Sequence, residues 1–117
     1  MTSNESNSPP TRLLFVCSQN VLRSPTAEKV FSGWPGLEVK SAGTDRDAVV
    51  PLNAELIAWA DVVVVMEIWH RDRILKRFRN AMAGKRVVVL GIPDEYDYME
   101  PALVEILKVQ VPLVVGV

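Results

Sequence analysis

The chain has 117 residues, of which 49% are hydrophobic, and this is enough for one domain with a substantial core. Its 13 Lys and Arg residues nearly balance its 14 Asp and Glu residues, so the net charge of -1 excludes a general attraction to nucleic acid or anionic membrane. The single cysteine, Cys17, excludes an internal disulfide and any multi-cysteine zinc site.

Residues 1–11 are polar and end in Pro-Pro-Thr, with no apolar stretch of the kind found in a signal peptide. We expect them to be a disordered lead-in to a single domain over residues 12–117. No apolar run approaches the roughly 20 residues that a membrane helix requires. We therefore expect a soluble, cytoplasmic protein without membrane contact; the sequence does not indicate its oligomeric state.

Short apolar runs alternate with amphipathic stretches along the rest of the chain. The apolar runs predict strands buried on both faces, over residues 12–17, 37–43, 62–66 and 86–90. Four helices are predicted from cap residues and apolar stripes: one that Ser24 caps, one over 53–60, one over 68–83, and one that begins at Glu100-Pro101. Residues 44–52 are predicted to be a loop, and the tail from residue 111 an edge strand or a packed coil.

Strands that alternate with helices predict right-handed crossovers between parallel strands. The expected fold is therefore an α/β fold, a small doubly wound three-layer sandwich with a four-stranded, mostly parallel sheet and helices on both faces. Ligands of such folds bind beyond the carboxyl ends of the strands. Two loops leave these ends with reactive residues: residues 17–24 after the first strand, and residues 91–101, with Asp94 and Asp97, after the fourth.

The first of these loops has the composition of an oxyanion site. Five residues separate Cys17 from Arg23 at the start of a helix, so several main-chain N–H groups can point inward with the positive helix end behind them. Arg23 can bind two oxygens of a phosphate group, and this positive field favours a thiolate at Cys17. Ser24 can donate to the sulfur, and Asn20 tolerates a left-handed backbone.

The sequence Cys17-x5-Arg23-Ser24-Pro25, followed by Thr-Ala-Glu, resembles the low-molecular-weight protein tyrosine phosphatases. The preceding strand LLFV, Asn20 at the third place after the cysteine, and the segment Ser-Ala-Gly-Thr at 41–44 fit the same resemblance. It covers most of residues 12–110 and implies one phosphatase-like domain over 12–117.

The resemblance implies a role for each site residue. Cys17 is the nucleophile that forms a phosphocysteine, Arg23 binds phosphoryl oxygens, and Asp94 is the general acid. The other substrate-binding residues of the loop are Ser18, Gln19, Asn20, Val21, Leu22 and Ser24. No metal or other cofactor is implied, and the expected partner is a phosphotyrosine protein or a small aryl phosphate. A phenolic oxygen, with a pKa of about 10, gains from a donated proton when it leaves.

The sequence departs from the family's pattern at four places. Asp94 is followed by Glu95 rather than proline, so Asp97 is an alternative acid. Leu22 replaces the family's second cysteine, which excludes the protective disulfide of some members. Gln19 replaces a glycine, and residues 44–53 form a shorter segment than is usual in the wall of the substrate cleft.

Two other functions remain open at this stage. The protein could reduce arsenate with an external thiol, or it could bind phosphate as a non-catalytic regulatory module. Residues 70–86 are rich in Lys and Arg, which is typical of the wet face of a helix; a docking surface for an acidic partner or RNA is the alternative. His70, the one histidine, excludes a His-based metal site and is interpreted as a solvated surface residue.

Overall fold

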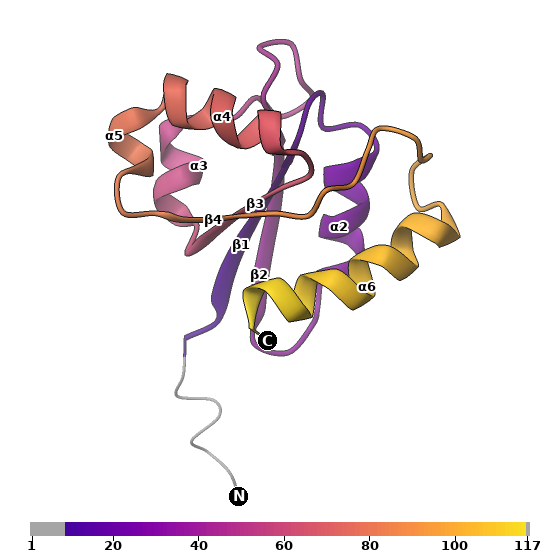
Figure 1. Ribbon diagram of the computed structural model, residues 1–117. Coiled ribbons are helices and arrows are strands. Elements are labelled where there is room, and N and C mark those ends of the chain that lie inside the picture. The colour runs from indigo at the N-terminus through magenta and orange to yellow at the C-terminus, as the bar shows by residue number, and fades with distance from the viewer. Residues whose placement is uncertain (1–8, 117) are drawn as a thin grey trace, which may run out of the picture.

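The four predicted strands form one parallel sheet in the order β2-β1-β3-β4 (Figure 1). The structure, a computed structural model, describes residues 9–116. The strands are β1 (Thr11–Cys17), β2 (Leu37–Gly43), β3 (Val62–Val65) and β4 (Arg86–Val89). The expected sheet is confirmed, and every pairing in it is parallel.

Helices cover both faces of the sheet, which confirms the three-layer sandwich (Figure 1). Helices α2 (Arg23–Phe31) and α6 (Pro101–Val115) pack on one face. Helices α3 (Ala54–Trp59), α4 (Ile68–Arg77) and α5 (Arg79–Met82) pack on the other. Within residues 9–116, no helix has the length and the apolar character needed to cross a membrane.

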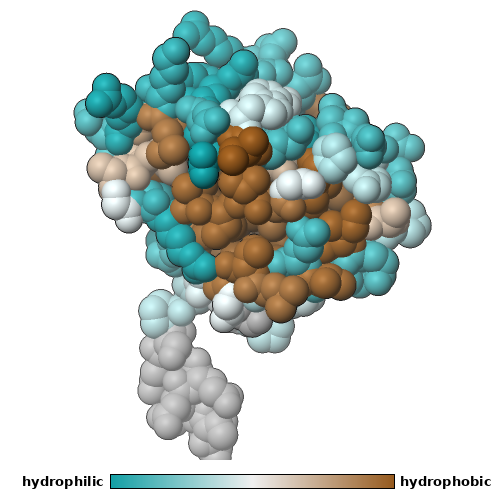
Figure 2. Space-filling view, viewed as in Figure 1, coloured by the Kyte–Doolittle hydropathy of each residue, from teal (hydrophilic) through white to brown (hydrophobic). Residues whose placement is uncertain are grey.

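The central strand β1 divides its side chains between the two cores. Leu13, Phe15 and Cys17 point toward α2 and α6, whereas Leu14 and Val16 point toward α3 and α4. This alternation follows from the two-residue period of a strand, and it explains why the run is apolar throughout. β4 is an edge strand with half-buried valines, and Figure 2 shows a broad apolar surface where β4 and α6 lie in Figure 1.

Two helix boundaries differ from the predicted ones. Helix α2 begins at Arg23 with Leu22 as its N-cap, so Ser24 lies inside the first turn and does not cap it. The hydroxyl of Ser24 instead contacts the sulfur of Cys17. The predicted helix over 68–83 is interrupted at Phe78 between α4 and α5, and nothing in the structure explains the break.

The prediction for the tail was wrong, because α6 continues through Pro112 to Val115. Its buried residues recur at every fourth position: Leu103, Leu107, Val111 and Val115. This spacing keeps one apolar stripe on the α2 side of the sheet, and the stripe outweighs the loss of one N–H donor at Pro112. Gly116 ends the helix in a left-handed conformation, with φ of 79°.

The predicted lead-in over residues 1–11 is only partly described by the structure, whereas the predicted loop over 44–52 is confirmed. Thr11, which was assigned to the lead-in, is the first residue of β1, while residues 1–8 lie outside the described part, so their disorder stays a prediction. Residues 44–52 contain no helix or regular strand, as expected. They fold back on Gly43, whose N–H donates to Val50 and whose carbonyl accepts from Leu52.

The strand order places the carboxyl ends of β1 and β3 side by side. The chain passes from β1 to β2 at one edge and then crosses back to β3 on the other side of β1. A reversal of this kind is the point where ligands bind in open parallel sheets. The loop after Cys17 and the first turn of α4 therefore meet at this point.

Gly43 allows the close approach of the loop that follows β1. A Cβ atom at this position would lie 2.5 Å from the carbonyl oxygen of Ser18 and 2.6 Å from the Cβ of Ala48. Gly84 is a matched control, since its φ is 73° but a Cβ there would meet nothing within 4 Å.

We predict that Gly43→Ala displaces the loop after Cys17 and lowers the free energy of unfolding by about 2–3 kcal/mol, because the clash involves main chain. Gly84→Ala should cost about 1–2 kcal/mol from its positive φ alone. Urea unfolding and the amide NMR shifts of residues 18–24 measure both effects. Unchanged loop shifts in Gly43→Ala would contradict the close approach.

Candidate active site

The loop after β1 curls around a cavity of about 160 Å³. A cavity of this size suits a small anion. The cavity is lined by Cys17, Ser18, Gln19, Val21, Leu22, Arg23 and Asp94. Although Cys17 is only 3% exposed, it forms part of the cavity wall and is not sealed among aliphatic side chains.

Three carbonyl groups at the start of the loop face away from the cavity toward residues 44–49. The carbonyl oxygens of Cys17, Ser18 and Gln19 accept N–H groups of this segment at 2.9, 2.9 and 3.0 Å. In a trans peptide the next N–H points in the opposite direction, so the N–H groups of Ser18 and Gln19 face the other side. No N–H of residues 18–22 donates to another group within residues 9–116. These amides are available to an oxyanion.

A series of hydrogen bonds links the sulfur of Cys17 to polar side chains in the protein interior. The Sγ atom of Cys17 lies 3.0 Å from Oγ of Ser24. The amide of Asn20 donates to Oγ of Ser24 and to Oγ of Ser41, both at 2.9 Å. Ser41 in turn donates to a carboxylate oxygen of Glu28 at 2.5 Å. Asn20 has φ of 60°, which confirms the expected left-handed residue.

The hydrogen of Ser24 has two possible acceptors. Because Ser24 already accepts from Asn20, its own hydrogen goes either to the sulfur of Cys17 or to the carbonyl of Ala42 at 3.3 Å. A thiol can donate to Ser24 while Ser24 donates to Ala42. When the sulfur loses its proton, the same hydroxyl can turn and donate to the thiolate.

Within residues 9–116, Arg23 makes its side-chain hydrogen bonds through Nη1 alone. It is 2% exposed, and its Nη1 donates to Oε2 of Glu67 at 2.5 Å and to the carbonyl of Ile92 at 2.9 Å. Its Nη2 donates to no group within residues 9–116, and is thus available to a ligand oxygen. Burial alone raises the pKa of the Glu67 carboxyl, but the hydrogen bond and the charge of Arg23 outweigh burial and hold that pKa below its ordinary value.

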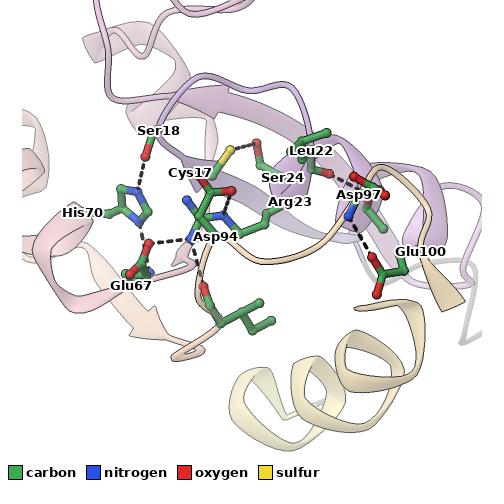
Figure 3. Close-up of polar contacts among 12 residues, drawn as sticks. Cys17, Ser18, Leu22, Arg23, Ser24, Glu67, His70, Asp94, Asp97 and Glu100 are labelled. Atoms are coloured by element: carbon green, nitrogen blue, oxygen red, sulfur yellow. Dashed lines mark hydrogen bonds and ion pairs between the residues drawn. The ribbon is translucent and has the colours of Figure 1, made fainter. Parts of the chain in front are cut away.

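His70 is fully buried, so its interpretation as a surface residue was wrong. Its Nδ1 accepts the N–H of Glu67 at 3.0 Å, and its Nε2 lies 3.0 Å from Oγ of Ser18 (Figure 3). Burial, followed by the charge of Arg23, lowers the pKa of His70 to about 4. His70 is therefore neutral at neutral pH. Sequence reasoning missed this residue because three charged residues, Arg71, Asp72 and Arg73, follow it in the chain.

The two candidate acids occupy different places (Figure 3). Asp94 lines the cavity, is largely exposed, and has Oδ1 3.7 Å from Nε of Arg23. Asp97 does not line the cavity, and its main-chain N–H donates to a carboxylate oxygen of Glu100 at 3.0 Å. The arrangement brings Asp94, and not Asp97, to the sulfur and the guanidinium.

The remaining loop residues divide into two groups. Ser18, Gln19, Val21 and Leu22 line the cavity, as expected of binding residues. Asn20 and Ser24 are buried and do not line it; they contact the sulfur and the loop from inside the protein. Within residues 9–116, no group of three or more His, Cys, Asp or Glu side chains could hold a metal ion.

Basic side chains of α4 tie the segment after β2 in place. Arg73 forms an ion pair with Asp45 at 3.0 Å, and Arg77 donates to the carbonyl of Thr44 at 2.6 Å. Other basic residues of 70–86, such as Arg79, remain exposed. The proposed docking of an acidic partner or RNA on this surface stays a prediction.

The chain is similar in sequence to a known phosphatase. The chain is 35% identical to the protein-arginine-phosphatase of Geobacillus stearothermophilus, in an alignment that covers 62% of this chain and 65% of that relative. The match thus spans slightly less than two thirds of the relative's length. No family model matches the chain.

Solved structures give the same result over a longer range. The YwlE arginine phosphatase from Geobacillus stearothermophilus superposes with a TM-score of 0.70 at 26% identity, covering 92% of this chain and 94% of that one. The tyrosine phosphatase Wzb from Escherichia coli K30, solved in complex with phosphate, has a TM-score of 0.67 at 20% identity, covering 83% and 90%. The second likeness is evidence for the fold alone.

We predict that protonation of His70 destabilises the protein in mild acid. Its folded pKa of about 4 lies below the ordinary value of 6.5, so the unfolded chain binds the proton more strongly. The free energy of unfolding should fall as pH decreases from 6.5 to 4, by on the order of 3 kcal/mol. Urea unfolding across this range measures the fall, and His70→Gln, which cannot titrate, should show a smaller slope. Equal slopes would contradict a buried neutral imidazole.

Proposed function

We propose that the chain is a member of the low-molecular-weight protein tyrosine phosphatase family, and that it is a metal-independent phosphomonoester hydrolase that acts through a phosphocysteine on Cys17. The observation that carries the proposal is the cavity in which Cys17, the guanidinium of Arg23 and unpaired main-chain amides meet. Such a site can hold three phosphoryl oxygens while the sulfur faces the phosphorus. Phosphoryl transfer requires chiefly this positioning and stabilisation of charge.

In the first step, the thiolate of Cys17 attacks the phosphorus and the bond from phosphorus to the leaving oxygen breaks. The loop amides and the free Nη2 of Arg23 hold the three remaining oxygens as the transition state forms. The protonated carboxyl of Asp94, at the edge of the cavity, gives its proton to the leaving oxygen. The products are a free alcohol or phenol and a phosphocysteine.

In the second step, water attacks the phosphocysteine and the bond from sulfur to phosphorus breaks. The carboxylate of Asp94 accepts a proton from the attacking water, so it returns to its starting form. The leaving sulfur takes up negative charge, which the hydroxyl of Ser24 stabilises when it turns from Ala42 to the sulfur. Inorganic phosphate then leaves the cavity.

We expect the cavity to hold the phosphoryl group itself. The rest of the substrate therefore lies at the mouth, beside the exposed side chains of Val21 and Gln19. We propose a phosphorylated protein side chain or a small aryl phosphate as the substrate. Peptides that carry phosphotyrosine or phosphoarginine, compared with an aryl phosphate, distinguish between the substrates.

We predict that Cys17→Ser abolishes hydrolysis of an aryl phosphate, because the oxygen nucleophile lacks the reactivity of the thiolate. Asp94→Ala should lower the rate by about 10²–10⁴-fold, the usual contribution of a general acid. Asp97→Ala is the matched control and should leave the rate near that of the wild type. Steady-state kinetics without added thiol measure all three variants.

Three outcomes would overturn parts of this proposal. A larger loss in Asp97→Ala than in Asp94→Ala would reverse the choice of the acid. Phosphate binding without turnover by the wild type would indicate a regulatory module. Oxidation of an added thiol that depends on arsenate, with no hydrolysis, would indicate an arsenate reductase.

A further inference from the structure

We propose that His70 is a positioning residue of this site, which holds the hydroxyl of Ser18 against the first turn of α4 and so fixes the loop that binds the oxyanion. The inference rests on the proposed function, since it concerns the same site. It begins from two contacts of one buried imidazole, with the N–H of Glu67 and with Oγ of Ser18.

These two contacts assign the tautomer of the ring. The main-chain N–H of Glu67 can only donate, so Nδ1 of His70 carries no hydrogen. In a neutral imidazole the hydrogen is then on Nε2, which donates to Oγ of Ser18 at 3.0 Å. Ser18 is thus the acceptor, and its own hydrogen is not used by His70.

Ser18 is consequently held from two sides. Its carbonyl accepts the N–H of Asp45 at 2.9 Å, and its hydroxyl accepts from His70. The residue follows Cys17 directly and lines the cavity. The two bonds fix the orientation of the peptide units whose N–H groups face the bound oxyanion. Donors that are fixed before the ligand arrives stabilise developing charge more than mobile ones do.

The surroundings of His70 keep the imidazole neutral. The charged groups that face it are Arg23 from α2, Asp45 from the segment after β2, Glu67 at the N-cap of α4, and Arg73 in the middle of α4. A second proton would place an N–H on Nδ1 directly against the N–H of Glu67, and would add positive charge beside Arg23. The pKa of about 4 agrees with this geometry. The ring of Trp69 lies 4.1 Å from that of His70.

The first turn of α4 therefore contacts the loop at both of its ends. His70 binds Ser18 at the beginning of the loop, and Glu67 binds Arg23 at its end (Figure 3). A simpler explanation is that His70 serves only to cap α4 through its contact with Glu67. The two explanations differ in which nitrogen matters: Nε2 for the loop, and Nδ1 for the cap.

Two substitutions separate the two nitrogens. His70→Gln can place an amide nitrogen near the position of Nε2, so it keeps the donor to Ser18 but loses the acceptor for Glu67. His70→Asn has a shorter side chain that can keep the acceptor near Nδ1 but does not reach Ser18. The measurements are the Kd for inorganic phosphate by calorimetry, kcat/KM for an aryl phosphate at pH 7, and the thermal midpoint.

We expect His70→Asn to weaken phosphate binding and kcat/KM by about three- to tenfold, the value of one hydrogen bond. His70→Gln should restore both toward the wild type, although its thermal midpoint is the lower of the two because α4 has lost its cap. In a Ser18→Ala background, the Asn and Gln variants should bind phosphate equally, since the hydroxyl that separates them is gone.

The opposite order, with His70→Gln weak and His70→Asn like the wild type, would show that His70 only caps the helix and would overturn the inference. Equal Kd values in the two single variants would overturn it as well. If the wild type binds phosphate but hydrolyses no ester, the proposed function fails while the Kd series still decides the role of His70. If the wild type binds no phosphate, both proposals fail.

Discussion

The direction of three peptide groups determines whether this protein has a site at all. The carbonyls of Cys17, Ser18 and Gln19 point outward because residues 44–49 supply N–H groups to each of them. If these carbonyls turned inward, their partial negative charge would repel an oxyanion and the amides would face the protein interior. The short segment after β2 is therefore part of the binding site although it does not line the cavity. Arg73 and Arg77 of α4 hold this segment in turn.

The buried polar groups around the sulfur of Cys17 are also held by hydrogen bonds. Asn20, Ser24, Ser41 and Glu28 form a network in which the amide of Asn20 donates to both serine hydroxyls and Ser41 donates to Glu28. Within residues 9–116, Thr44 is the one residue whose buried side-chain oxygen lacks a partner. Polar groups withdrawn from water remain stable only when they are paired in this way, so the network has few alternative arrangements. The loop conformation follows from that constraint.

Much of the fold could be predicted because its signals are local. The apolar runs of the four strands and the capping contact of Asn53 with Leu56 depend on neighbours in the chain. The failures involve partners distant in sequence. Ser24 has the signature of a helix cap, yet the sulfur of Cys17 binds its hydroxyl. His70 is followed by three charged residues, and only the crossing of the chain from β2 to β3 brings it against Ser18.

The close packing of the loop after β1 against Gly43 affects the entropy change when an anion binds. With its carbonyls bonded and no room for the loop to relax toward β2, residues 18–20 lose their conformational freedom when the chain folds. Little further ordering then accompanies the arrival of an anion, so the entropy change on association comes mainly from released water and from the immobilised ligand. The cavity is therefore a preorganised binding site, whose shape is fixed before the anion binds.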